Sequence, residues 1–308
     1  MRTLVIVNAT CDLPGAFIRQ NQMRVLPVKL VLGDHIFTDS RDANLTLFFH
    51  QRYASSRQPD VEVETCSADA ITALFLDQWV AEYDRAILLA ISKTGDRLFE
   101  SATEASFAVL RAYREKRRQA GLNTPFYLNV LDSRTIFAGE AMLAWETMRL
   151  LQDQNLPFNE LRRRIENFRQ HIHCYLLPND FGYAPDRIVE KDRPSAGFLD
   201  FHLSNLLDIK QAGLFYDGKI SIAFKRRGFD QAFAHLLELA KQAIDQGLKS
   251  PLVVVSYAGD PQVIKQKKAF GEFEQHARQW GVEVMLSMMS ATGGVKVGPG
   301  AVSLAYAA

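Results

Sequence analysis

Apolar residues along this chain form short continuous runs that stop abruptly at small or polar residues. The plainest run spans residues 86–91, ends at Ser92, and is followed by helix-like spacing from Leu98. Continuous apolar runs bounded by turn residues are typical of strands buried on both faces of a parallel sheet. Similar runs at residues 3–7 and 126–131, each followed by a predicted helix, indicate alternating strands and helices and therefore an α/β fold.

The pattern changes at Asn155-Leu156-Pro157, which is the candidate domain boundary. Beyond it, two strand-like runs flank Asp217-Gly218, a strong hairpin signal. One helix is expected from residue 260 to about residue 280. Helices mixed with antiparallel strands predict an α+β unit. We therefore expect a three-layer N-terminal α/β domain with a parallel sheet over residues 1–155, and a C-terminal α+β domain over residues 156–308.

Composition narrows the range of functions. The net charge of +1 makes no global field that would attract nucleic acid or an anionic membrane. No run approaches the ~20 apolar residues that a membrane span needs. The three cysteines lack metal-ligand or CxxC spacing, which favours free thiols in a reducing compartment and predicts a cytoplasmic protein.

The usual catalytic motifs are missing from the sequence. It contains no GxSxG, HExxH, GxxxxGK[ST] or GxGxxG pattern, and its seven histidines do not fall at zinc spacing. Self-contained hydrolysis, nucleotide hydrolysis and dinucleotide redox chemistry therefore lack their usual residues, and we expect no catalysis by this chain alone, no resident metal and no cofactor.

Hydroxyl side chains follow two of the predicted strands. Thr65 and Ser92 each come after a strand and before a helix. In parallel sheets, ligands bind beyond the carboxyl ends of the strands, where the N–H groups of the next helix favour an anion. If the two strands are neighbours, both hydroxyls face one crevice, and residues 92–96 hold the acidic head of a small molecule. The alternative is that each residue is only a helix N-cap.

A glycine-rich segment near the end of the chain carries a lysine. Residues 292–300 read TGGVKVGPG, with Lys296 at the centre. Such a segment forms either a backbone nest for an anion or a tight turn, and the pattern does not choose between the two.

Short segments along nearly the whole chain together resemble one family. They are VNATCDLP (residues 7–14), FTD (37–39), TCSAD (65–69), SKTGDRLFESA (92–102), Asp132-Ser133, LDIKQA (207–212) and VGPGA (297–301). Their order and spacing are similar to those of the DegV proteins. These are fatty-acid-binding proteins that include the binding subunits of bacterial fatty-acid kinase.

The resemblance implies a ligand, a partner and a set of site residues. A long-chain fatty acid would be held at its carboxylate by Thr65, Ser92 and Lys93, with Arg187 and Lys296 as cations near the head group. A fatty-acid kinase would be the protein partner, and no nucleic acid would bind. The acyl chain would lie in a tunnel lined largely by the second domain, although core packing explains each candidate equally well: Phe198, Phe201, Leu206, Leu207 and Ile209.

Departures from the family pattern cluster where the head group is expected. The family's SerGlyThr becomes residues 96–98, its GlyGly becomes Pro185-Asp186, and its His becomes Lys296. Asp96 adds a negative charge that would repel a ligand carboxylate unless it pairs with a cation such as Arg97 or Lys93. A second hypothesis follows: an enzyme or sensor for another small anion that uses Lys296, Arg187 and Asp96.

Overall fold

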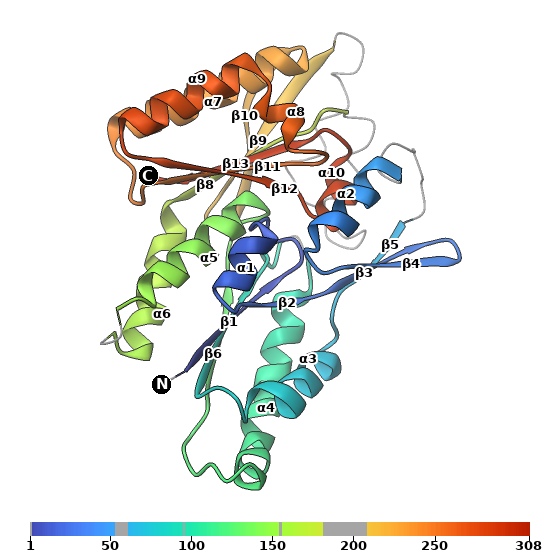
Figure 1. Cartoon of the computed structure of the whole chain (residues 1–308), viewed down its shortest axis with the longest axis vertical. Helices are drawn as coiled ribbons and strands as arrows, with labels where there is room; N and C mark the ends of the chain where they lie inside the picture. The colour runs from blue at the N-terminus through green and yellow to red at the C-terminus, as the bar shows by residue number, and fades with distance from the viewer. Residues whose placement is uncertain (1, 53–60, 95, 154–155, 181–207) are drawn as a thin grey trace.

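The computed structural model describes residues 2–52, 61–94, 96–153, 156–180 and 208–308. Over these residues the chain forms three β-sheets with helices packed around them (Figure 1). The sequence pattern also predicts a short helix over residues 197–206, which lie outside the described residues.

The first half is built on a four-stranded sheet, which we call the N-terminal sheet. Its order is β2-β1-β6-β7 and every ladder is parallel. The predicted parallel sheet is confirmed, and all four carboxyl ends meet at one edge, as in other parallel sheets. The strands are β1 (Thr3–Asn8), β2 (Arg24–Leu26), β6 (Arg85–Ala90) and β7 (Tyr127–Asp132).

Amphipathic helices connect these strands. In α4, residues Leu98, Ala102, Ala105, Val109 and Tyr113 recur at three- and four-residue spacing and are all buried, so one stripe of the helix packs on the core. The connecting helices are α1 (Gly15–Gln20), α3 (Ala68–Leu74) with its π-helical continuation η1 (Phe75–Trp79), and α4 (Leu98–Gln119).

A small antiparallel sheet with the order β4-β3-β5 extends from the first one. Pro27, which has no N–H group for a ladder hydrogen bond, separates β2 from β3. The strand before Thr65 therefore belongs to the small sheet, and it is not a neighbour of the strand before Ser92. The elements here are β3 (Val28–Leu32), β4 (His35–Asp39), α2 (Ala43–Arg52) and β5 (Val61–Glu64).

The second half contains a six-stranded mixed sheet, the C-terminal sheet, with the order β10-β9-β8-β13-β11-β12. The β11–β12 ladder is parallel, and the other four ladders are antiparallel. Asp217 and Gly218 both have positive φ between β9 and β10, so the predicted hairpin is confirmed. The strands are β8 (Ile172–Leu177), β9 (Ile209–Tyr216), β10 (Lys219–Arg227), β11 (Leu252–Tyr257), β12 (Glu283–Met288) and β13 (Val302–Ala307).

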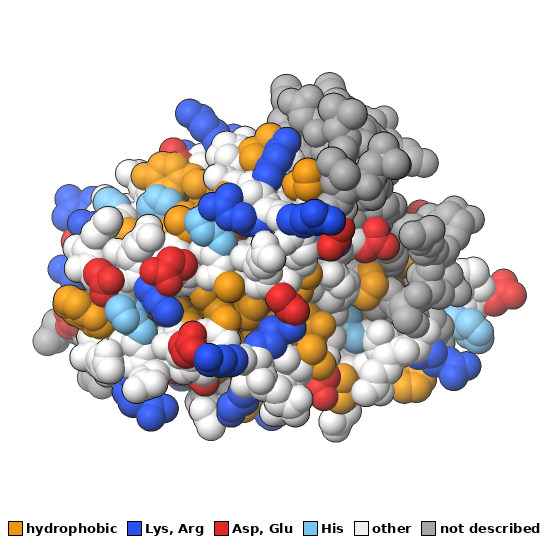
Figure 2. Space-filling view, turned by 90° about the horizontal axis from the view of Figure 1, so that it is seen from above, with side chains coloured by type: hydrophobic (Ala, Val, Ile, Leu, Met, Phe, Trp, Pro, Cys, Tyr) orange, Lys and Arg blue, Asp and Glu red, His pale blue; other side chains and the backbone are white. Residues whose placement is uncertain are grey.

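The helices of the second half include α7 (Phe229–Gln246), which packs against α9 (Lys268–Gln279). The single helix expected at residues 260–280 is instead divided into α8 (Gln262–Lys265) and α9, because the backbone of Lys267 is extended. On the face seen in Figure 2, basic and acidic side chains are interspersed, in keeping with the net charge of +1. Within the described ranges, no helix combines the length and hydropathy needed to cross a bilayer.

Helix α5 (Ala138–Leu150) joins the two halves. It is buried almost all round and contacts β8, β11 and β13 on one side and β1 on the other. A helix buried on all sides is expected to be apolar all round, and most of α5 is. After α5, α6 (Phe158–Phe168) and a 3-10 turn, η2 (Arg169–His171), lead into β8. The domain boundary at residues 155–157 stays a prediction.

Candidate functional site

The candidate site lies at the edge of the N-terminal sheet where its strands end. The loops after β6 and β7 are bonded to each other, since Ser92 N donates to Thr135 O at 3.1 Å and Ser133 N donates to Ala90 O at 2.9 Å. From the second half, α10 (Ala291–Val297) reaches this edge, because Lys296 Nζ lies 3.3 Å from Asp96 Oδ2. We call Ser92, Asp96 and Lys296 the sheet-edge site.

Ser92 is a buried hydroxyl and not a helix cap. It is 1% exposed, and its Oγ shares a hydrogen bond of 2.9 Å with Thr94 Oγ1. The following helix starts only at Leu98, whose N–H donates to Asp96 Oδ1 at 2.9 Å. The N-cap interpretation is therefore wrong for Ser92.

Thr65 approaches the same edge from the other side of β1. Its neighbour Cys66 donates through Sγ to Pro27 O at 3.3 Å, and Pro27 directly follows β2. Because β1 lies between β2 and β6, Thr65 is near the β2 end of the edge and Ser92 is at its β6 end. Thr65 is half-buried and does not cap α3, since Ser67 Oγ accepts the Ala70 N–H at 3.2 Å.

The glycine-rich segment is helical over residues 292–297, which neither interpretation of the sequence anticipated, and it ends in a turn at residues 299–300, as one of them expected. Residues Ala291–Val297 are helical, with Ser290 Oγ capping the helix by accepting from Gly293 N at 2.8 Å. Lys296 is 9% exposed and its charge is matched by Asp96. The cation expected for Asp96 was Arg97 or Lys93, and the structure provides Lys296 instead. The side chain of Lys93 is exposed.

Helix α10 is held against α2 by buried polar contacts. Asp39 Oδ2 accepts from both N and Oγ1 of Thr292, each at 2.8 Å. His50 Nε2 donates to Met289 O at 2.8 Å, and burial lowers the pKa of this imidazole. A Cβ on Gly294 would lie 2.5 Å from His50 Cε1, so close packing of α2 and α10 requires glycine there. Asp39 belongs to the FTD motif, and Thr292 and Gly294 belong to the glycine-rich segment, but neither motif indicated that the two would meet.

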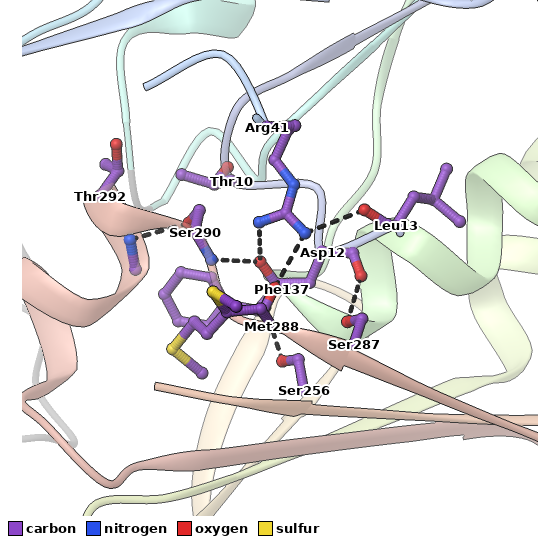
Figure 3. A network of polar contacts seen from close by, with 12 residues as sticks. Thr10, Asp12, Leu13, Arg41, Phe137, Ser256, Ser287, Met288, Ser290 and Thr292 are labelled. Atoms are coloured by element: carbon purple, nitrogen blue, oxygen red, sulfur yellow. Dashed lines mark hydrogen bonds and ion pairs between the residues drawn. The ribbon is translucent and has the colours of Figure 1, made fainter. Parts of the chain in front are cut away.

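A second network joins the loop after β1 to the C-terminal sheet (Figure 3). Asp12 Oδ1 accepts from Ser290 N at 2.9 Å and pairs with Arg41 at 3.3 Å, and Asp12 Oδ2 accepts from Ser256 Oγ at 2.6 Å. Arg41 also donates to Met288 O at 2.8 Å. Burial raises the pKa of Asp12 to about 6, although Arg41 opposes this shift. We call Asp12, Arg41, Ser256, Met288 and Ser290 the joint.

Glu140, a buried carboxyl group that sequence reasoning missed, lies near the end of β1. Glu140 Oε1 accepts from Thr10 Oγ1 at 3.0 Å and from Phe137 N at 2.9 Å, and Asn8 Nδ2 donates to Thr10 Oγ1. Burial raises the pKa of Glu140 to about 8, with the charge of Asp12 adding to the shift. Glu140 is therefore mostly protonated at neutral pH and serves as a neutral partner in this network.

The remaining predicted residues fall elsewhere. Ile209 begins β9 and is half-buried. It borders a hollow of about 320 Å³ whose described walls otherwise come from residues 225–227 and not from the sheet-edge site. Among the described residues, no three His, Cys, Asp or Glu side chains gather into a metal-binding cluster. The following candidates lie outside the described residues: Arg187, Phe198, Phe201, Leu206 and Leu207.

Comparison with known sequences matches this chain along its whole length. A family model described as "Uncharacterised protein, DegV family COG1307" matches residues 2–308. A DegV domain-containing protein of Xanthomonas campestris pv. campestris is 34% identical over 308 residues, which is 100% of this chain and 98% of that protein. A Xanthomonas axonopodis pv. citri protein of the same description is also 34% identical over the same shares of the two chains.

Solved structures share the fold at lower identity. DegV from Bacillus subtilis, described as a fatty acid binding protein, has a TM-score of 0.76 at 17% identity, covering 100% of this chain and 99% of that one. A DegV family protein from Thermus thermophilus, described by its fatty acid binding, has a TM-score of 0.75 at 18% identity, with 100% of both chains covered. The Streptococcus pneumoniae Fatty Acid Kinase (Fak) B3 protein, loaded with linoleic acid, has a TM-score of 0.73 at 17% identity, covering 100% and 99%.

Proposed function

This chain belongs to the DegV family, and on that premise we propose that it is a long-chain fatty-acid-binding protein. The observation that carries the proposal is the match of fold, along the entire chain, with proteins described as fatty-acid-binding. The sheet edge adds support, because buried hydroxyls lie there beyond the carboxyl ends of parallel strands, where ligands of open α/β sheets bind.

In this proposal the carboxylate lies between Thr65 and Ser92. The two residues lie on opposite sides of β1, and in this proposal a carboxylate over the end of β1 accepts a hydrogen bond from each hydroxyl. Ser92 is buried, which strengthens its hydrogen bonds relative to those of an exposed hydroxyl. Lys93 remains a candidate for binding the carboxylate, and Arg187 remains a candidate cation for the head group.

The acyl chain supplies most of the binding energy in this arrangement. Burying about fifteen methylenes at ~0.8 kcal/mol each gives roughly 12 kcal/mol before ordering costs. A charge-assisted hydrogen bond adds ~1.5–3 kcal/mol. The hydroxyls therefore orient the ligand more than they hold it. The proposed lining residues are Phe198, Phe201, Leu206, Leu207 and Ile209.

We infer that the chain binds its ligand without transforming it and presents the carboxylate to a fatty-acid kinase. The likeness of its fold to the Streptococcus pneumoniae protein supports this role. The rival hypothesis, an enzyme or sensor for a small anion, depends on Lys296 as a point charge. Since Asp96 neutralises that lysine, a small anion gains less there than at an isolated cation.

Native mass spectrometry of freshly purified protein tests the proposal. We expect an adduct with the mass of one fatty acid, and we expect delipidated protein to unfold at a higher temperature when oleate or palmitate is added. A clean apo mass together with no thermal shift for either acid would contradict it. Glycerol 3-phosphate, an anion without an acyl chain, serves as the control ligand.

A further inference from the structure

A buried ion pair occupies the place where the ligand's head group is proposed to lie. Asp96 and Lys296 are each 9% exposed, and their charged atoms are 3.3 Å apart. Asp96 belongs to the loop that begins at Ser92, whereas Lys296 comes from α10, 200 residues later in the chain. The pair therefore links the two halves of the molecule at the loop that begins with Ser92.

The pair is held in place from both sides. Asp96 Oδ1 accepts from Leu98 N at 2.9 Å, and Oδ2 is the oxygen near Lys296. Helix α10, which carries the lysine, is anchored by Thr292 to Asp39 and by Ser290 to Asp12. These hydrogen bonds hold both charged side chains in place. A ligand carboxylate would therefore compete with Asp96 for Lys296.

The electrostatics of this arrangement disfavour a second anion. Lys296 and Asp96 together are neutral, so a carboxylate bound against the pair would give these three buried groups a net negative charge. Lys93 is exposed, so water and salt screen its charge. Removing the lysine from its buried partner instead would leave Asp96 uncompensated, which is costly in a buried site. An uncharged head group meets neither cost, and hydroxyls such as Ser92 and Thr94 both donate and accept hydrogen bonds with it.

We propose that Asp96 is a specificity-determining residue that reduces the preference of this chain for carboxylates and admits long-chain lipids with uncharged polar heads, such as fatty amides and fatty alcohols. The proposal rests on the proposed function, since it takes lipid binding at the sheet edge as given. In this proposal the ion pair sets the preference for the head group, and the proposed apolar tunnel binds the acyl chain.

Asp96→Asn tests this inference, because asparagine keeps the acceptor for Leu98 N and removes the charge. We measure dissociation constants of oleate and oleamide for the delipidated full chain by titration calorimetry. Wild-type protein is expected to bind the two lipids within about tenfold of each other. The variant is expected to bind oleate about tenfold more tightly than wild type does, with oleamide changed less than twofold.

Asp77→Asn is the matched control, since it removes an equal charge from an exposed pair with Lys116. We expect it to change neither affinity by more than about twofold. Thermal unfolding checks that both variants fold, and the wild-type ratio of oleate to oleamide affinity tests the inference without any variant.

The outcomes separate the two proposals. If wild-type protein binds neither lipid, the proposed function fails. If it binds oleate more than about a hundredfold more tightly than oleamide, or if Asp96→Asn changes both affinities equally or not at all, the inference about Asp96 is overturned while fatty-acid binding stands.

Discussion

Two buried acid–cation pairs lie where the halves of this molecule meet, and their surroundings differ. In the joint, both oxygens of Asp12 accept hydrogen bonds from Ser256 or Ser290, and Arg41 donates to a main-chain carbonyl of the second half. At the sheet-edge site, Lys296 approaches one oxygen of Asp96 as a point charge, beside the loop of Ser92. The first pair is built into the packing, and the second links α10 to the loop that is proposed to bind the ligand's head group.

The comparison teaches that a buried charge pair acts on stability or on selectivity according to what surrounds it. Both terminal nitrogens of the Arg41 guanidinium bind fixed acceptors of the protein, namely Asp12 and the carbonyls of Leu13 and Met288. The Lys296–Asp96 pair instead joins α10 to the loop proposed to bind the ligand, so it sets the charge that a head group meets there.

Asp12→Ala is expected to have the largest effect. It leaves Arg41 buried without its anion and removes the acceptor of Ser256 and Ser290, so the free energy of unfolding should fall by about 3–5 kcal/mol. Urea denaturation measures the loss, with Asp77→Ala, in an exposed pair, as the control at below about 1 kcal/mol. If Asp12→Ala loses no more stability than the control, the claim that the Asp12–Arg41 pair stabilises the fold is contradicted.

Two buried carboxyl groups, Asp12 in the joint and Glu140 near it, predict that the stability of the protein depends on pH. The pKa values of Asp12 and Glu140 are raised to about 6 and about 8 in the folded protein. Between the ordinary pKa of each carboxyl group and its raised pKa in the folded protein, the folded state binds more protons than the unfolded state. The free energy of unfolding therefore falls as pH rises through this range. The slope is up to about 1.4 kcal/mol per pH unit for each group.

Glu140→Gln isolates its share of this slope. Above about pH 6 the slope belongs mainly to Glu140, so the variant should lose most of the decrease that wild type shows between pH 6 and pH 8. Denaturation curves at pH 5, 6.5 and 8 give the comparison. Equal slopes in the two proteins would contradict a protonated Glu140.

Gly294→Ala tests whether α10 is rigidly packed over the sheet edge. The added methyl would lie 2.5 Å from the His50 ring, so we expect a loss of about 1–3 kcal/mol. Gly271→Ala is the control, because nothing lies within 4 Å of a Cβ there and helix α9 should gain about 0.5–1 kcal/mol. Similar stabilities for the two variants in urea would show that α10 shifts to make room for the methyl group.

Thr65→Ala is expected to have the smallest effect, and it bears on the ligand alone. Loss of one charge-assisted hydrogen bond of ~1.5 kcal/mol should weaken oleate binding about tenfold with little change in stability. Thr103→Ala, which removes a hydroxyl bonded to Phe99 O within α4, serves as the control in a fluorescence competition assay. Unchanged oleate affinity would remove Thr65 from the site.

Sequence reasoning recovered the strands because their signal is local. The run at residues 86–91 predicts β6 within one residue at each end, and the Asp217-Gly218 pair predicts the hairpin that the structure contains. It also placed Ser92 at a strand end. It did not anticipate the helix α10, because two glycines favour turns unless packing against His50 rewards a helix.

The sequence by itself determined the alternating α/β pattern of the first half, the family, and the hydroxyl groups that end its strands, since each depends on neighbouring residues or on motif order. Only the tertiary structure decided which charges meet. Asp96 has two cations within three residues of it in the chain, yet its partner Lys296 lies 200 residues away. The joint likewise assembles Asp12 with Ser256 and Ser290. Such pairings follow from the packing of α10 and the two sheets around α5, and no local pattern records them.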